Sequence, residues 1–102
     1  MANRLKTNPI VIDSVSATDI IKNPRVVALI WQNTAASNRD IAIADVLTIK
    51  AVDQFGNATG TIFEHKATTA GVGDNIAFSE PWCPGDLNVT AIDGGELYIF
   101  LA

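Results

Sequence analysis

Six consecutive apolar residues, Val26 to Trp31, form the feature that most constrains how this chain can fold. Asn23-Pro24 precedes the run and a polar stretch begins at Asn33, so the run is too short to span a membrane. Its β-branched and aromatic side chains suit the pleated surface of a strand. A strand without a polar face must be covered on both sides. The run therefore predicts a central strand whose two faces are covered by other parts of the chain or by another subunit.

The rest of the sequence consists of short apolar or alternating stretches separated by Gly, Pro, Asn and Asp, which mark turns. Strands are expected at residues 9–13, 25–32, 41–53, 61–66, 76–78, 87–92 and 97–101, and residues 41–45 are a separate short strand in an alternative interpretation. Residues 14–23 predict a loop, with one helical turn as the alternative. Seven or eight short strands without a convincing helix predict a single antiparallel β-sandwich or jelly roll.

The N-terminal end differs in character from the rest. A length of 102 residues predicts one domain. Residues 1–8 are polar and basic, with Leu5 as the one large aliphatic residue after Met1, so we expect an N-terminal arm before a β-sandwich domain at residues 9–102. Arg4 and Lys6 are the candidate contact residues of this arm.

Charge is distributed unevenly along the chain. The net charge is −4, but the chain carries about +3 up to Arg39 and about −7 from Asp40 onward. Chance surface charge is one explanation of this asymmetry. The other is a basic arm that docks on the acidic surface of a neighbour. An acidic body argues against nucleic acid as the main partner.

The sequence predicts no catalytic, metal or cofactor site, and we expect a protein that is not an enzyme. His65 is the only histidine and Cys83 the only cysteine, so one chain lacks the ligands of a zinc site. No nucleophile motif accompanies His65, which is expected to be exposed, and Gly71-Val72-Gly73 lacks the context of a phosphate loop. No apolar segment suggests a secretory signal or a membrane span, so we expect synthesis in a cytoplasm-like setting.

A low content of charged residues and five of the seven aromatic residues suggest that part of the surface is covered. Charged residues make up 18% of the chain, below the roughly 25% of typical soluble domains. This favours a homo-oligomer, and we expect a closed trimer. Three interpretations of the aromatic residues stay open, namely core packing, a subunit interface and a sugar-stacking platform; the residues are Trp31, Phe78, Trp82, Tyr98 and Phe100. The candidate interface aromatics are Trp82, Tyr98 and Phe100.

Three stretches resemble small virion structural proteins of tailed bacteriophages. They are the opening residues 5–11, the run at 27–32, and the ending at 87–101 with its Gly-Gly-Glu-Leu-Tyr-Ile-Phe. The resemblance implies a β-sandwich decoration (cement) protein that is present in many copies in the virion, contacts the major capsid protein or other virion proteins, and has no catalytic residues. Another head–tail or tail component is an alternative. A small carbohydrate- or peptide-binding β-sandwich module is the alternative from a different class.

Overall fold

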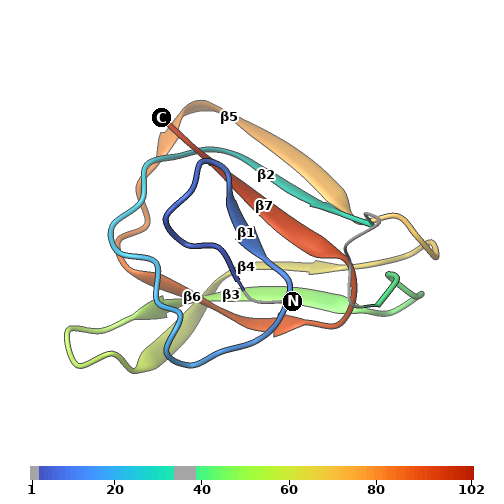
Figure 1. Ribbon diagram of the computed structural model, residues 1–102, viewed down its shortest axis with the longest axis horizontal. Coiled ribbons are helices and arrows are strands. Elements are labelled where there is room, and N and C mark those ends of the chain that lie inside the picture. Colours follow the sequence, from blue (N-terminus) through green and yellow to red (C-terminus); the bar gives the residue numbers. More distant parts are fainter. Residues whose placement is uncertain (1–2, 34–38) are drawn as a thin grey trace.

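Seven antiparallel strands form two packed sheets, as the sequence predicted, in a computed structural model that describes residues 3–33 and 39–102 (Figure 1). The strands are β1 (Ile10–Ile12), β2 (Val26–Gln32), β3 (Val46–Val52), β4 (Ala58–Lys66), β5 (Asp74–Trp82), β6 (Leu87–Ile92) and β7 (Glu96–Leu101). One sheet has four strands in the order β1-β7-β2-β5, and the other has three in the order β4-β3-β6. The described residues contain no helix, and therefore no helix that could cross a membrane.

Strand β2 is central in the four-stranded sheet, as its apolar run predicted, but only one of its two faces is fully buried. It pairs with β7 on one side and with β5 on the other. Val26, Leu29 and Trp31 are buried against the second sheet, where Leu47 and Ile49 of β3 belong to the same core. The alternate residues of β2 lie on the opposite face of the sheet, because successive side chains of a strand point to opposite sides.

Two strands are longer than the sequence predicted. Strand β4 begins at Ala58, and β5 extends from Asp74 to Trp82 through Pro81. Both are edge strands of their sheets. A proline is tolerated there because an edge strand does not need every backbone N–H for pairing. The turn residues in the sequence therefore led to predicted strands that are shorter than the observed β4 and β5.

The expected strand over residues 41–53 is wrong in its first half, because only Val46–Val52 is a strand. Residues 41–45 contain a turn, and Ala44 has a positive φ of 73°. Ile41 is nevertheless buried, and its carbonyl accepts a hydrogen bond from the N–H of Gly71 at 2.7 Å. Burial, rather than strand pairing, explains the apolar residue at this position. Most of the polar loop expected at residues 33–40 lies outside the described residues.

The loop predicted at residues 14–23 covers the free edge of β6. Ile21 and Leu87 exchange two backbone hydrogen bonds of 2.8 and 3.0 Å. The buried Asn88 side chain donates to the carbonyls of Ser16 and Asp19 at 2.9 and 3.1 Å. The loop thus closes one edge of the three-stranded sheet.

Residues 3–8 do not form the free arm that the sequence predicted, but fold back onto β1. Arg4 and Val11 exchange backbone hydrogen bonds of 2.8 and 2.9 Å, and Leu5 packs against the core. The Asn3 side chain accepts from the N–H of Asp13 and donates to the carbonyl of Ser14. The segment folds back because β1 would otherwise be an open edge, and pairing with Arg4 covers part of it.

Candidate functional site

The outward-facing residues of the four-stranded sheet form its most distinctive surface. Leu29 and Trp31 of β2, and Leu97 and Ile99 of β7, are buried on the inner side. The alternate positions of these strands therefore face outward. We call the patch formed by Ala28, Ile30, Ala77, Tyr98 and Phe100 the outer sheet face.

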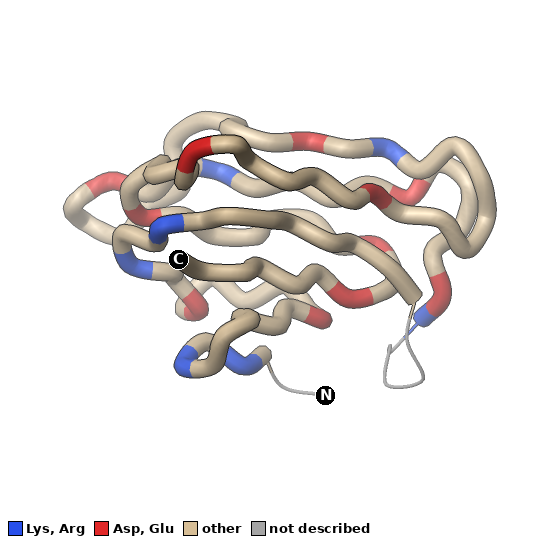
Figure 2. The backbone as a smooth tube through the Cα atoms, turned by 90° about the horizontal axis from the view of Figure 1, so that it is seen from above, with Lys and Arg blue, Asp and Glu red and all other residues tan. Residues whose placement is uncertain are grey.

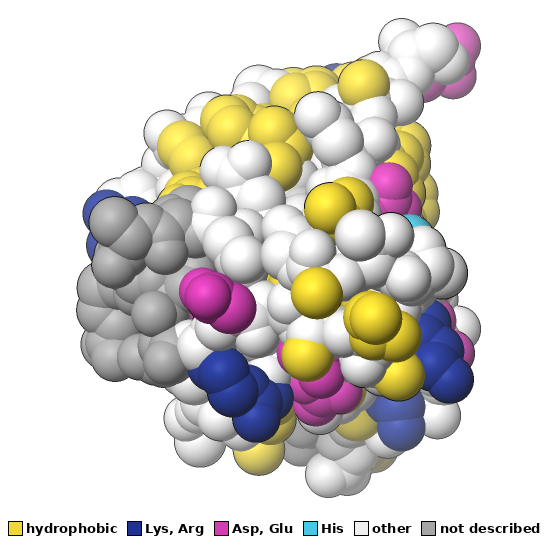
Figure 3. Space-filling view, turned by 90° about the vertical axis from the view of Figure 1, so that its right-hand side faces the viewer, with side chains coloured by type: hydrophobic (Ala, Val, Ile, Leu, Met, Phe, Trp, Pro, Cys, Tyr) yellow, Lys and Arg dark blue, Asp and Glu magenta, His cyan; other side chains and the backbone are white. Residues whose placement is uncertain are grey.

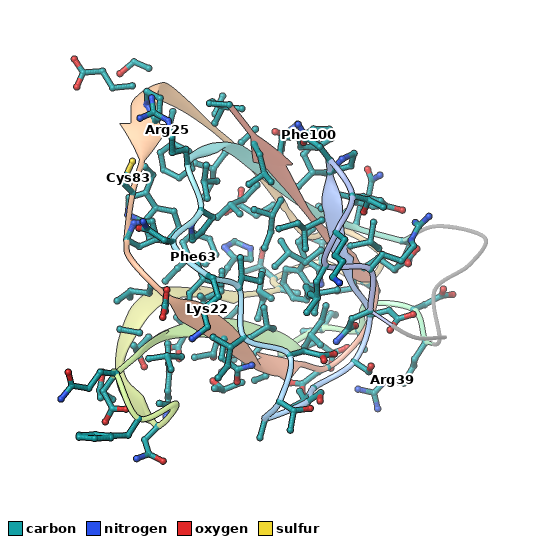
Figure 4. All side chains as sticks on the ribbon, turned by 60° about the vertical axis from the view of Figure 1, so that its left-hand side comes forward. Lys22, Arg25, Arg39, Phe63, Cys83 and Phe100 are labelled. Atoms are coloured by element: carbon teal, nitrogen blue, oxygen red, sulfur yellow. The ribbon has the colours of Figure 1, made fainter. Side chains whose placement is uncertain are left out.

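Cross-strand pairing brings the members of the outer sheet face together. Ile30 lies opposite Tyr98, and Ala28 lies opposite both Phe100 and Ala77. These side chains are half-buried or exposed, in contrast to the buried inner rows. Figure 3 shows hydrophobic side chains gathered at the top of the molecule, where this sheet lies. Figure 4 shows Phe100 at the outer side of the same sheet.

The four-stranded sheet carries almost no charge. Its strands contain only three charged residues, Asp74, Glu80 and Glu96, and β1 and β2 contain none. Figure 2 shows that the charged positions lie toward the strand ends and leave the middle of the sheet uncharged. Glu96 is buried and accepts a hydrogen bond from the Tyr98 hydroxyl at 3.2 Å. An apolar surface with few charges is typical of sites where proteins contact each other.

The structure brings two of the three candidate interface aromatics together. Tyr98 and Phe100 lie on the outer sheet face, two residues apart on β7. Trp82 is at the far end of β5, where its ring stacks on Phe78 with the ring centroids 5.5 Å apart. Trp82 and Phe78 both pack against the core. The sequence therefore grouped Trp82 with residues that occupy a different part of the fold.

The candidate arm residues contribute to the surface in different ways. Arg4 is attached to β1 through its backbone. Lys6 lines a groove of about 390 Å³, together with Ile10, Ile21 and Leu101. Lys22 is at the same groove but already forms an ion pair with Asp86 at 3.3 Å. The groove is mostly aliphatic, so it suits an apolar group better than a charged one.

The sequence suggested that His65 is exposed, but the structure shows a half-buried side chain. It points inward from β4, where its ring meets Trp31 edge-on with the centroids 5.8 Å apart. Its Nδ1 lies 3.3 Å from a carboxylate oxygen of Asp74 on β5. The pair joins the two sheets at one side of the sandwich. The sequence did not predict this orientation. The inward-facing side of an edge strand is only half covered, so a polar ring such as that of His65 can lie there.

Cys83 and the acidic residues form no recognisable reaction centre. The Cys83 side chain is exposed after β5 and points away from the sandwich in Figure 4, close to Arg25. Over residues 3–33 and 39–102 no group of three or more His, Cys, Asp or Glu side chains is arranged to hold a metal ion. Several aspartates satisfy backbone donors at turns instead: Asp53 accepts from the N–H of both Phe55 and Asn57 at 2.9 Å.

Ala28 and Ile30 are interface candidates that sequence reasoning missed. They belong to the apolar run, for which the sequence left open a face against another subunit without indicating which residues form it. The alternation of buried and half-buried residues along β2 becomes visible only when its partners are known. Comparisons of the chain with protein-family models, curated proteins and solved structures found no match. The outer sheet face therefore stands on its own geometry as the candidate site.

Proposed function

We propose that the chain is a non-enzymatic structural protein of a tailed-bacteriophage particle that binds neighbouring major capsid protein subunits as a decoration, or cement, protein. The outer sheet face is the observation that carries this proposal, because it is apolar, contiguous and nearly free of charge. Its larger side chains are only half-buried within one copy, and a partly exposed apolar face is suited to contact another protein.

The proposed mechanism is mechanical. Each copy contacts subunits of the shell through Ile30, Tyr98 and Phe100, which supply aliphatic and aromatic contact area. One such interface is modest in strength. Many copies on one particle multiply its effect, since a subunit that is held at several points cannot leave unless all of the contacts break. The protein would be made in the host cytoplasm and function in the virion.

The resemblance of residues 5–11, 27–32 and 87–101 to small virion proteins gives the class of partner. Two of these stretches include β2 and β7, the central strands of the four-stranded sheet. The segments that carry the resemblance thus supply most of the outer sheet face. This coincidence supports the proposal and favours the decoration role over that of a soluble sugar-binding module.

The test is binding to purified phage heads that lack this protein. Ile30→Lys and Phe100→Lys each place a charge in the outer sheet face, and both should reduce sedimentation of the protein with the heads. Gln54→Lys is the matched control, because Gln54 is exposed in the turn between β3 and β4 of the other sheet, and it should bind like the parent. Circular dichroism must show that all three variants are folded.

Two results would overturn the proposal. One is a parent protein that does not sediment with heads at any concentration tested. The other is equal binding by the parent and both outer-face variants, which would move the contact elsewhere. Binding to immobilised glycans in the absence of head binding would assign the protein to the alternative class.

A further inference from the structure

Within the part of the chain that the structure describes, two of the four edge strands of the sandwich are partly covered by other segments, and the other two are open. Residues 3–8 pair with β1 at Val11, and residues 14–22 pair with β6 at Leu87, so both edges on that flank are partly covered. On the other flank, β4 and β5 are also edge strands, each nine residues long. Within residues 3–33 and 39–102 no segment pairs with their free edges. Free edges of this length are templates for another strand.

The two free edges lie on the same flank and at the same level. Strands β4 and β5 are joined by residues 67–73, and His65 of β4 contacts Asp74 of β5 at 3.3 Å. His65, the only cyan residue, marks this flank at the right-hand side of Figure 3. Ile76 and Phe78 of β5 and Phe63 of β4 lie along this flank and are only half-buried, whereas Ile49 and Ile99 of the central strands are fully buried. The core is thus incompletely closed where the edges are open.

We propose that a second copy of this chain closes this flank, with β5 of each copy pairing antiparallel with β4 of the other about a two-fold axis parallel to the strands. Such an axis exchanges the layers, so the four-stranded sheet of one copy continues into the three-stranded sheet of the other. Both free edges of both copies become paired, and the interface is isologous.

The register of this pairing follows from the His65–Asp74 contact. Because the axis is parallel to the strands, the rotation keeps each residue at the same height along the axis. Residues at the same height within one copy therefore also have the same height in different copies. Asp74 therefore lies opposite His65 of the second copy, and the inward-facing Ile76 lies opposite the inward-facing Phe63 of the second copy. The two half-buried side chains cover each other, as cross-strand apolar pairs do. Asn75 then faces Glu64 of the second copy on the outer side.

Charge selects this pairing over the alternative of β5 with β5. The charged residues of β5 are Asp74 and Glu80, both acidic, whereas β4 ends in Glu64-His65-Lys66 and carries both signs of charge. If two β5 strands paired antiparallel so that Ile76 faced Phe78, Asp74 would face Glu80 at both ends. Like charges opposite each other destabilise a sheet. In the proposed pairing, Asp74 instead lies opposite His65 of the second copy, with Glu64 on one side and Lys66 on the other.

The proposed dimer does not depend on the proposed function, but the two are compatible. The two-fold axis places the outer sheet faces of the two copies on opposite sides of the dimer. In such a dimer one outer sheet face contacts the shell, and the other points away from it. It differs from the trimer expected from sequence alone, since matched open edges favour a two-fold axis.

Disulfide trapping tests the pairing in the full-length chain with Cys83→Ser. The double variant Asn75→Cys/Glu64→Cys should give a covalent dimer on mild oxidation, because directly opposite residues have Cβ atoms close enough for a disulfide. Within one copy these two positions lie on the outer sides of different sheets, about 10 Å or more apart, so they cannot form a bond with each other. Ser79→Cys/Glu64→Cys is the matched control and should remain uncross-linked, since Ser79 lies several residues away in the register.

Sedimentation analysis gives an independent readout without cysteines. The parent should be a dimer at micromolar concentrations. Lys66→Glu should weaken association about tenfold, since the dimer contains the β4–β5 pairing two times and each pairing gains a glutamate near Asp74. Lys6→Glu makes the same charge change on the covered flank and should not alter association. A parent that is monomeric or trimeric, or equal cross-linking of both cysteine pairs, would overturn the proposal.

Discussion

The indole of Trp31 donates a hydrogen bond from Nε1 to the carbonyl oxygen of Gly94 at 2.8 Å. Trp31 ends the apolar run on β2, and Gly94 lies in the turn between β6 and β7. The bond is buried, so neither group has water as a substitute partner. It ties the central strand to the connection that brings the chain from the three-stranded sheet to the four-stranded one.

Trp31→Phe should lower the free energy of unfolding by about 2–3 kcal/mol. The variant loses packing area and leaves the buried Gly94 carbonyl without its donor, which alone costs about 1–3 kcal/mol. Trp82→Phe is the control, because Trp82 is half-buried and no described residue accepts a hydrogen bond from its indole. Urea unfolding of both variants checks this. A smaller loss for Trp31→Phe than for Trp82→Phe would mean that the buried bond adds no stability.

Gly73 illustrates a glycine required by close approach. A Cβ at this position would lie 2.0 Å from the carbonyl oxygen of Trp31. Gly73→Ala should therefore destabilise the fold by about 1–3 kcal/mol through a forced backbone shift. Gly60→Ala should be neutral or slightly stabilising, since nothing lies within 4 Å of a Cβ there. Thermal unfolding of the pair distinguishes steric conflict from the general effect of adding a methyl group.

Gly85 illustrates a different requirement, that of backbone conformation. Its φ is +83°, which confirms the prediction that the Pro84-Gly85 turn needs a residue with positive φ. No atom lies within 4 Å of a Cβ at this position, so the cost of a substitution is conformational. Gly85→Val should destabilise by more than about 1 kcal/mol. Gly60→Val in a strand should cost less, and equal melting temperatures for the two variants would contradict the argument.

The N-terminal segment is now expected to contribute to stability. Deletion of residues 1–6 removes the pairing between Arg4 and Val11, the hydrogen bonds of Asn3 and the packing of Leu5. A free arm, as expected from the sequence, would leave the melting temperature nearly unchanged on deletion. The structure instead predicts a loss of about 1–3 kcal/mol, since several buried or half-buried groups lose their partners.

Point variants separate the contributions to this loss. Leu5→Ala should account for about 1 kcal/mol or more through lost packing, measured by urea unfolding. Lys6→Ala should have little effect on unfolding, because Lys6 is exposed. If the deletion melts at the temperature of the parent, the contacts of residues 3–6 do not stabilise the folded state.

Local patterns in the sequence were sufficient for the class of fold and for several elements. The runs at β2 and β7 predicted central strands, and Leu87–Ile92 was predicted with its observed bounds. These predictions succeeded because apolar runs and strict alternation reflect burial directly. The turn at Pro84-Gly85 also has a local cause, because proline fixes its own φ and glycine adopts a positive φ without strain. None of these features requires knowledge of which strands are neighbours.

Strand order was decided only by the tertiary structure, and the candidate surfaces depend on it. Tyr98 and Ile30 become neighbours because β7 pairs with β2, across 67 intervening residues. Trp82 and Phe100 look alike in the sequence, yet one packs against the core and the other faces outward. The open flank at β4 and β5 likewise exists only because the chain covers β1 and β6 with its own N-terminal segments. A residue's type determines whether it favours burial, but the pairing of distant strands determines which face is left without a cover.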